Sequence, residues 1–167
     1  MKIFLKKHKT SLIYALVILV GIGLDQLSKY LAATYIKSEI TVIGRLLHFD
    51  YVENRGAAWG MLKDHRWVFM LVSSVAIIAF AVYLFGFKVP NKLYGVSVAL
   101  VISGGVGNMI DRIALGYVVD FLKFAFINFP VFNIADSLVC IGAGLLILAM
   151  VLDVVKEARE KKSGEKK

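Results

Sequence analysis

The sequence contains few of the residues on which thiol or metal chemistry is commonly built. Cys140 is the only cysteine among 167 residues, so no intramolecular disulfide can form. It lies in an apolar stretch, and we expect it to be a small buried hydrophobe. A catalytic thiol would require a nearby histidine. The three histidines are in a leading segment and a long connection, which disfavours a thiol mechanism or a histidine-based metal site: His8, His48 and His65.

Proline is scarce, and both prolines lie between the long apolar runs of the sequence. Pro90 is in a turn short enough to make the two flanking runs antiparallel neighbours. Pro130 prevents a helix from continuing through its position. Asn133 follows and is well placed to cap the next helix, with Asp136 as the third helical residue of a capping box.

Apolar residues, in contrast, make up 59% of the chain, and the mean hydropathy is +0.74. A soluble domain of this size lacks the polar side chains to cover so much apolar surface. A helix needs roughly 20 residues to cross the hydrocarbon core. The long runs lack the alternation of strands, and open strands leave backbone groups unpaired in lipid. We therefore predict an all-α polytopic membrane protein with four transmembrane helices, at about residues 12–31, 68–87, 93–110 and 134–152.

Acidic residues are outnumbered by basic ones, 12 to 20, and the distribution of this charge predicts the topology. Lysines precede the first run, separate the second from the third, and follow the fourth, so these segments are expected to be cytoplasmic. Residues 1–167 then form a single membrane domain with both termini cytoplasmic and with extracytoplasmic segments at about 32–67 and 111–133. A basic tail is also compatible with nucleic acid, but anchoring against anionic lipid is the simpler account. We expect no nucleic-acid partner.

The N-terminal segment shares features with a secretory signal peptide, since a basic start precedes an apolar stretch. Polar residues follow that stretch, and the small-residue site around Ala32 matches a cleavage site poorly. We expect the segment to be retained as the first span.

The first outer connection has two predicted parts. Strand-forming residues from Ile40 to Val52, broken at Gly44, predict a small extracytoplasmic β element at the membrane surface. The short apolar stretch from Gly56 to Leu62 is too short to span a membrane. It predicts an interfacial helix with Trp59 at headgroup level.

Acidic residues at membrane depth are costly and mark candidate functional sites. Asp111, Asp120 and Asp136 all belong to the outer ends of the third and fourth runs. Asp111 has a structural explanation if it pairs with Arg112 or Lys29, and Asp136 has one as a capping residue. Asp120 lies between Val119 and Phe121 with no such explanation. From spacing alone, a catalytic dyad, ion coupling and a structural polar cluster all stay open.

Asp25 and Lys29 form an i,i+4 pair near the outer end of the first run. We expect this pair mainly to anchor the helix at the interface, with Lys29 extending to the membrane surface and with a secondary role in supporting the outer face.

Five blocks of the sequence together resemble the bacterial lipoprotein signal peptidase (signal peptidase II) family. They occur in the family's order and cover the chain from the first run to the fourth: DQLSK (25–29), ENRGAAW (53–59), GGVGNMIDR (104–112), GYVVDF (116–121) and FNIADS (132–137). The resemblance implies a bacterial inner-membrane aspartic endopeptidase whose active site is near the outer face. Its implied substrate is a diacylglyceryl-modified prolipoprotein, cleaved just before the lipidated cysteine, and its implied inhibitor is the cyclic peptide globomycin.

The resemblance also implies roles for particular residues. Asp120 and Asp136 would be the catalytic dyad. The substrate site would be lined by Asn54, Asn108, Arg112 and Asn133, with support from Asp25, Lys29, Trp59 and Asp111.

A carboxyl pair would hold one proton, activate a water and need no metal or organic cofactor. Asp136, in the first turn of a helix, is expected to hold the anion, and Asp120 the proton. We expect a monomer.

Two rival readings of the function remain at this point. A small ion-coupled transporter would use the same acids, but it predicts an inverted repeat or broken helices in corresponding halves, and the two halves differ in their loops. A non-catalytic membrane scaffold leaves Asp120 without an explanation.

Overall fold

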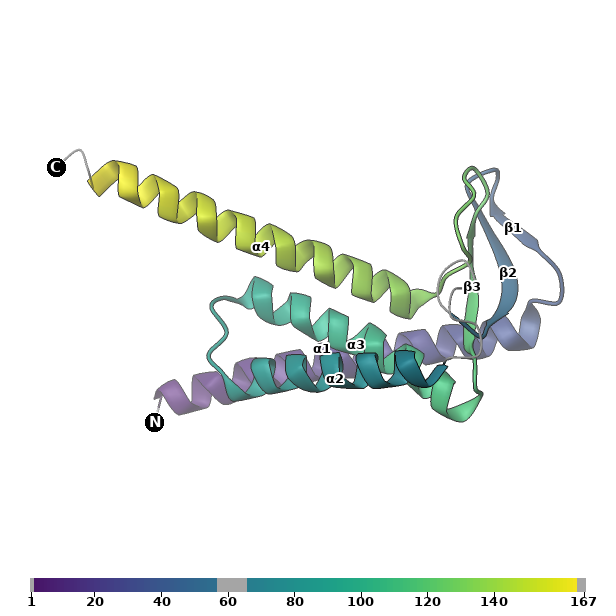
Figure 1. Ribbon diagram of the computed structural model, residues 1–167, viewed down its shortest axis with the longest axis horizontal. Helices are drawn as coiled ribbons and strands as arrows, with labels where there is room; N and C mark the ends of the chain where they lie inside the picture. Colours follow the sequence, from purple (N-terminus) through teal and green to yellow (C-terminus); the bar gives the residue numbers. More distant parts are fainter. Residues whose placement is uncertain (1, 57–65, 165–167) are drawn as a thin grey trace.

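The computed structural model describes residues 2–56 and 66–164 and is mostly helical, with a small sheet at one end (Figure 1). The expected interfacial helix around Trp59 lies outside the described residues. The elements in chain order are α1 (Lys2–Tyr35), β1 (Ile40–Ile43), β2 (Leu47–Asn54), α2 (Arg66–Gly86), α3 (Lys92–Ala114), β3 (Val118–Phe124) and α4 (Ile134–Gly164).

Helices α1, α3 and α4 contain the stretches that are long and apolar enough to cross a membrane. In α2 the corresponding apolar stretch, Met70–Gly86, is shorter. Many large apolar side chains on the outer faces of the helices are exposed in the structure. Their contact with lipid is favourable and their contact with water is not, as expected for membrane helices. Three of the predicted spans are thus confirmed by length and composition, and the crossing by α2 stays a prediction.

The four helices are arranged so that both termini and the α2–α3 turn lie at one end, and the sheet lies at the other (Figure 1). Helix α3 is central and packs against α1, α2 and α4. Its buried Val98, Ala99 and Ile102 form a core with Tyr14 of α1 and Leu84 of α2.

Two glycines let α3 approach its neighbours closely near the sheet. A Cβ at Gly104 would lie 2.2 Å from the Ala135 carbonyl oxygen in the first turn of α4. A Cβ at Gly107 would lie 2.5 Å from Oδ2 of Asp25 on α1. Glycine at these two positions therefore allows the close helix packing.

The three strands form one antiparallel sheet in the order β1-β2-β3. Gly44, with a φ of +42°, starts the turn between β1 and β2, as the break in the strand-forming residues predicts. In β2–β3 the register shifts between Phe49 and Val52, so that Val52 pairs with Asp120 and Asn54 with Val118. This register places the end of β2 beside the acid in β3.

One face of the sheet packs on the C-terminal end of α1. Val119 and Phe121 of β3 are buried against Ala32 and Ile36 of α1. Since the side chains of a strand alternate between the two faces, Asp120 points away from this apolar contact. Strand β3 therefore packs its apolar side chains on α1 and presents the Asp120 carboxyl on its other face.

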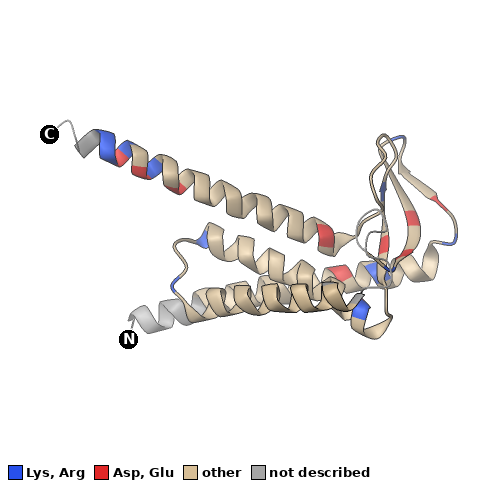
Figure 2. Ribbon diagram, viewed as in Figure 1, with Lys and Arg blue, Asp and Glu red and all other residues tan. Residues whose placement is uncertain are grey.

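Charged residues are unevenly distributed along the molecule (Figure 2). Lys88 and Lys92 lie near the α2–α3 turn, and a mixed, mainly basic segment ends α4, both at the end of the molecule opposite the sheet. The middle of each helix is almost free of charge. The basic segments that the positive-inside rule predicts to be cytoplasmic therefore lie together at one end of the molecule.

Candidate active site

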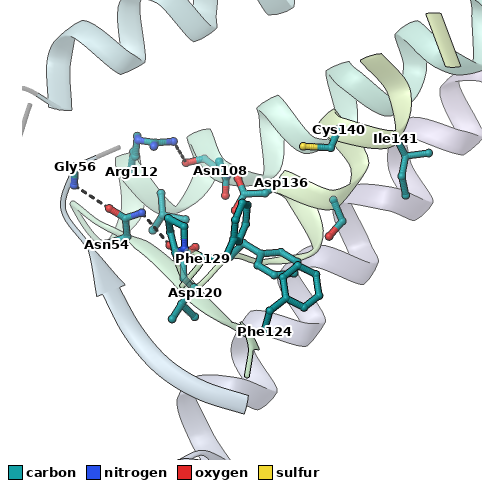
Figure 3. Close-up of a pocket in the computed structure, with 15 residues that line it drawn as sticks. Asn54, Gly56, Asn108, Arg112, Asp120, Phe124, Phe129, Asp136, Cys140 and Ile141 are labelled. Carbon is teal, nitrogen blue, oxygen red and sulfur yellow. Dashed lines mark hydrogen bonds between the residues drawn. The ribbon is translucent and has the colours of Figure 1, made fainter. Parts of the chain in front are cut away.

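Asp120 projects from β3 into a pocket at the junction of the sheet and the helices (Figure 3). Its side chain is almost completely buried, with 2% of the residue exposed. Both carboxylate oxygens accept a hydrogen bond, Oδ2 from Nδ2 of Asn54 at 2.8 Å and Oδ1 from Nδ2 of Asn133 at 2.7 Å. The strand register thus provides one amide donor and the segment before α4 provides the other.

Asp136 lies in the first turn of α4 and closes a capping box. The Asp136 backbone N–H donates to Oδ1 of Asn133 at 2.9 Å, and the Asn133 backbone N–H donates to Oδ2 of Asp136 at 3.1 Å. Its other oxygen accepts from Nδ2 of Asn108 on α3 at 2.7 Å. The predicted cap is confirmed, and the cap itself aims the carboxylate.

Asn133 connects the two acids. Its residue is fully buried, and its side chain donates to Asp120 while capping the helix that carries Asp136. The same amide donates to Oδ1 of Asn108 and to the carbonyl oxygen of Val119. One short side chain therefore fixes β3, α3 and α4 relative to each other at the site.

Burial raises the pKa of Asp120 to about 7. The hydrogen bonds from Asn54 and Asn133 favour the anion and oppose this rise, and the neighbouring Asp136 carboxyl adds to it. A carboxyl with a pKa near neutrality exists in both protonation states at physiological pH, as a group that gives and takes protons requires.

The pocket that both acids line has a volume of about 590 Å³ and combines a polar end with a long apolar wall. Asp120, Asp136 and their amide partners form the polar end, and Arg112 lies beside them (Figure 3). The Arg112 guanidinium donates to the carbonyl oxygen of Asn108 at 3.2 Å. The apolar wall comes from the end of β3, the following loop and α4: Phe124, Phe129, Pro130, Val131, Phe132, Cys140 and Ile141.

The structure brings together all four residues expected to line a substrate site. Asn54, Asn108 and Arg112 line the pocket, and Asn133 lies directly behind it through its bonds to both acids. Among the described residues, no group of three or more His, Cys, Asp or Glu side chains is arranged to hold a metal ion.

Two expectations about individual residues are wrong. Cys140 is exposed and lines the pocket, because the face of α4 that carries it turns away from α3. Lys29 does not extend to the membrane surface. It is 3% exposed and lies between Asp25 and Asp111, because the outer end of α1 is covered by α3 and the sheet.

The sequence argument missed two contributors. Gln26 bridges the buried acids, donating to Oδ2 of Asp25 and Oδ1 of Asp111 at 3.1 and 3.0 Å. Its position between Asp25 and Lys29 at membrane depth was the available signal. The aromatic wall was the other omission, and its signal was the dense phenylalanine spacing that produces a ring cluster: Phe124, Phe126, Phe129 and Phe132.

The fold is similar to two solved structures, each described as a bacterial membrane enzyme determined by the in meso method. The first has a TM-score of 0.80 and 34% identity, covering 85% of this chain and 89% of that chain. The second has a TM-score of 0.76 and 34% identity, covering 83% and 92%. The membrane helices, the pocket lined by two acids and the fold shared with these structures place the chain among membrane enzymes.

Sequence comparisons identify the family. Residues 17–152 match the family model of signal peptidase (SPase) II. Proteins named lipoprotein signal peptidase are similar to this chain in Halalkalibacterium halodurans (37% identity, 90% of this chain and 99% of that protein) and Symbiobacterium thermophilum (45%, 80% and 91%). A third, from Brevibacillus brevis, is 39% identical over 84% of this chain and 95% of its own length. The chain belongs to the signal peptidase II family and is a peptidase.

Proposed function

We propose that this protein is an intramembrane aspartic endopeptidase that removes signal peptides from prolipoproteins, with Asp120 and Asp136 as its catalytic dyad. Family membership supports the cleavage of lipoprotein signal peptides. The observation that carries the dyad is that one buried residue, Asn133, donates to both carboxyls at the polar end of an apolar pocket, from its side-chain amide to Asp120 and from its backbone N–H to Asp136.

In the proposed reaction the dyad holds one proton. The ionised carboxylate takes a proton from a water, whose oxygen attacks the scissile carbonyl carbon. The protonated carboxyl donates a hydrogen bond to the developing oxyanion. When the C–N bond breaks, the leaving amine receives a proton from the dyad, and the shared single proton is restored.

The resting proton is assigned to Asp120 and the negative charge to Asp136. Each carboxyl accepts two hydrogen bonds, so the number of donors does not separate them. The difference is the start of α4, where the helix dipole and the backbone N–H of Asn133 favour an anion at Asp136. Asp120 lies in a strand without such a dipole, and its pKa of about 7 keeps much of it protonated at neutral pH. The pair titrates as a unit.

The pocket's two parts match the two parts of the proposed substrate. A diacylglyceryl-modified cysteine brings acyl chains that require an apolar surface, which the phenylalanine-lined wall offers. Arg112 presents forked donors beside the acids, suited to substrate carbonyl or lipid phosphate oxygens. Cleavage just before the lipidated cysteine would place the scissile bond at the polar end. Globomycin, as a cyclic peptide inhibitor, would bind in the same pocket.

The proposed topology places this pocket near the outer face of a bacterial cytoplasmic membrane. Residues 1–167 form one membrane domain crossed by α1, α2, α3 and α4, with both termini cytoplasmic. The basic segments at the end opposite the sheet support this orientation (Figure 2), and α2 packs against α3 between the two ends. The protein is proposed to act as a monomer.

Replacing either acid tests the dyad. Purified Asp120→Asn and Asp136→Asn should lose about 10³-fold or more of the rate at which a diacylated prolipoprotein is cleaved, measured by gel shift with and without globomycin. Asp153→Asn is the matched control, because Asp153 accepts a hydrogen bond from Tyr94 at the opposite end of α4. It should retain wild-type activity. Substantial globomycin-sensitive cleavage by either dyad variant would refute the assignment.

A further inference from the structure

Lys29 is enclosed in the protein, and its ammonium group meets three acceptors. Nζ lies 2.9 Å from Oδ2 of Asp25 and 3.0 Å from Oδ2 of Asp111, and it donates to Oδ1 of Asn108 at 2.9 Å. Asp25, Lys29 and Asp111 are all at most 3% exposed. An ammonium group has three donors, so these contacts use its whole hydrogen-bonding capacity.

The two carboxylates that Lys29 joins hold the chain immediately before each proposed catalytic acid. Oδ1 of Asp25 accepts from the backbone N–H of Ala135 at 2.8 Å, one residue before Asp136. Oδ2 of Asp111 accepts from the backbone N–H of Val119 at 3.0 Å, one residue before Asp120. The two halves of the site are therefore held in the same way, by a buried carboxylate on the preceding N–H group.

The third acceptor, Asn108, carries the influence of Lys29 to the Asp136 side chain. Lysine can only donate, so its contact requires the Asn108 oxygen to face Nζ. The Asn108 nitrogen must then point the other way, where it donates to Oδ1 of Asp136 at 2.7 Å. Lys29, together with the Asn133 amide that donates to the same oxygen, thus determines which end of the Asn108 amide faces the acid.

We propose that Lys29 is a positioning residue of the peptidase, holding Asp120 and Asp136 in register through Asp111, Asp25 and Asn108 and supplying positive charge that favours the ionised member of the pair. This inference rests on the proposed dyad. It assigns Lys29 a role in the reaction that anchoring the helix at the membrane surface would not require.

The charge part of the proposal has a definite sign. Within residues 2–56 and 66–164, the charged groups around the dyad are Asp25 and Lys29 on α1, and Asp111 and Arg112 on α3. Lys29 and Arg112 favour an ionised dyad, and Asp25 and Asp111 oppose it. Removing the positive charge of Lys29 increases the affinity of the dyad for protons. The acid limb of the pH–rate profile, where the base loses its charge, should then move to higher pH.

Lys29→Met tests this inference, because methionine keeps the unbranched shape without donors or charge. We expect kcat to fall about 10²-fold with little change in KM, since the reacting groups are misplaced while the pocket remains. The acid limb should move up by about one pH unit. The matched control is Lys37→Met, just beyond the end of α1 at an exposed position where the structure shows the ammonium group donating to a backbone carbonyl. It should leave kcat and the profile unchanged.

Asp25→Asn provides the second arm, and it serves alone if Lys29→Met does not fold. The asparagine retains an oxygen to accept from the Ala135 N–H, but it removes a negative charge. The acid limb should therefore move to lower pH, opposite to the effect of Lys29→Met. A role in stability alone would lower the yield of folded protein and move neither limb, and unchanged limbs would overturn the inference. If Asp120→Asn or Asp136→Asn remains active, the proposed function fails instead.

Discussion

Two lysines of this protein each lie between two carboxylates, one inside the molecule and one on its surface. Lys29 joins Asp25 and Asp111 within the helices, with side chains at most 4% exposed. Lys123 joins Glu39 and Asp50 on the outer face of the sheet, with side chains 32–42% exposed. Every one of these ion pairs is within 3.0 Å, so close contact does not distinguish the two clusters. The surroundings do, because water screens the second cluster and not the first.

The comparison shows what burial adds to a lysine between two carboxylates. When a buried carboxylate loses its cation, no water can take the place of the cation, so the position of the carboxylate depends on its remaining hydrogen bonds. In the inner cluster those bonds are to the backbone before Asp120 and Asp136. In the outer cluster, the Lys123 contacts connect β3 to Asp50 of β2 and to Glu39 just before β1, at an exposed surface where water can replace them. The inner lysine can therefore affect chemistry, and the outer one mainly local order.

The largest expected effect is on stability when the inner cation is removed. Lys29→Met should lower the free energy of unfolding by about 3–5 kcal/mol, because it leaves two buried carboxylates without their cation. Lys123→Met is the matched variant of the outer cluster, and its Tm should stay within about 2 °C of wild type. Both are measured by thermal and denaturant unfolding in the same detergent. Equal losses in the two variants would remove the distinction between the clusters.

A smaller loss should follow when the inner cluster is disturbed without any change of charge. Gly107→Ala places a methyl group 2.5 Å from Oδ2 of Asp25, so the carboxylate must move away from Lys29. We expect a loss of about 1–3 kcal/mol in unfolding free energy together with lower peptidase activity.

Gly144→Ala is the control for Gly107→Ala, because nothing lies within 4 Å of the added Cβ on the exposed face of α4. It should be neutral or stabilise by about 0.5–1 kcal/mol, since alanine favours the helix. A Gly107→Ala variant as stable and as active as Gly144→Ala would show that the position of the Asp25 carboxylate is not critical.

The smallest expected effect is a pH dependence of the stability that His48 contributes in the outer cluster. Both ring nitrogens of His48 face acceptors, the Glu39 carboxylate and the Gly44 carbonyl oxygen, so the doubly protonated ring fits best. These contacts raise the pKa of His48, the one from Glu39 most. The stabilisation is full below the unfolded pKa of about 6.5 and is lost as pH rises through the higher folded value.

Thermal unfolding between about pH 5 and 9 measures this loss. The wild-type Tm should fall slightly across the range relative to His48→Gln, which has no imidazole to titrate. Parallel curves for the two proteins would show that the His48 contacts do not contribute to stability.

Much of the site could be predicted from local patterns. Asn133 and Asp136 are separated by the spacing of a capping box, and α4 begins there as the pattern indicates. Asp120 became a candidate because an acid between apolar neighbours had no local explanation, and the resemblance to the family then assigned it to the dyad. The break at Gly44 correctly separated β1 from β2. Each of these inferences depends on residues close together in the chain, where backbone geometry restricts the possibilities.

The predictions that were wrong or missing concern residues far apart in the chain. Cys140 was expected to be buried because its neighbours are apolar, but which face of α4 meets α3 depends on the packing of Gly104 and Gly142. Lys29 was expected at the membrane surface. Its pairing with Asp111 was one of the alternatives considered, but only the packing of α1 against α3 shows that the pair forms and is buried. The pairing of Asn54 with Asp120 depends on a register shift in β2–β3 that no local pattern predicts.

The sequence by itself determined that this is a membrane protein with acids at unusual depth, because lipid tolerates few arrangements of apolar helices and few buried charges. It also determined, through five ordered motifs, the family to which the chain belongs. Only the tertiary structure decided how the acids are held. A hydrogen bond acts over about 3 Å. The bond that Asn133 donates and the bonds that Asp25 and Asp111 accept therefore exist only after α1, α3, α4 and the sheet have packed together.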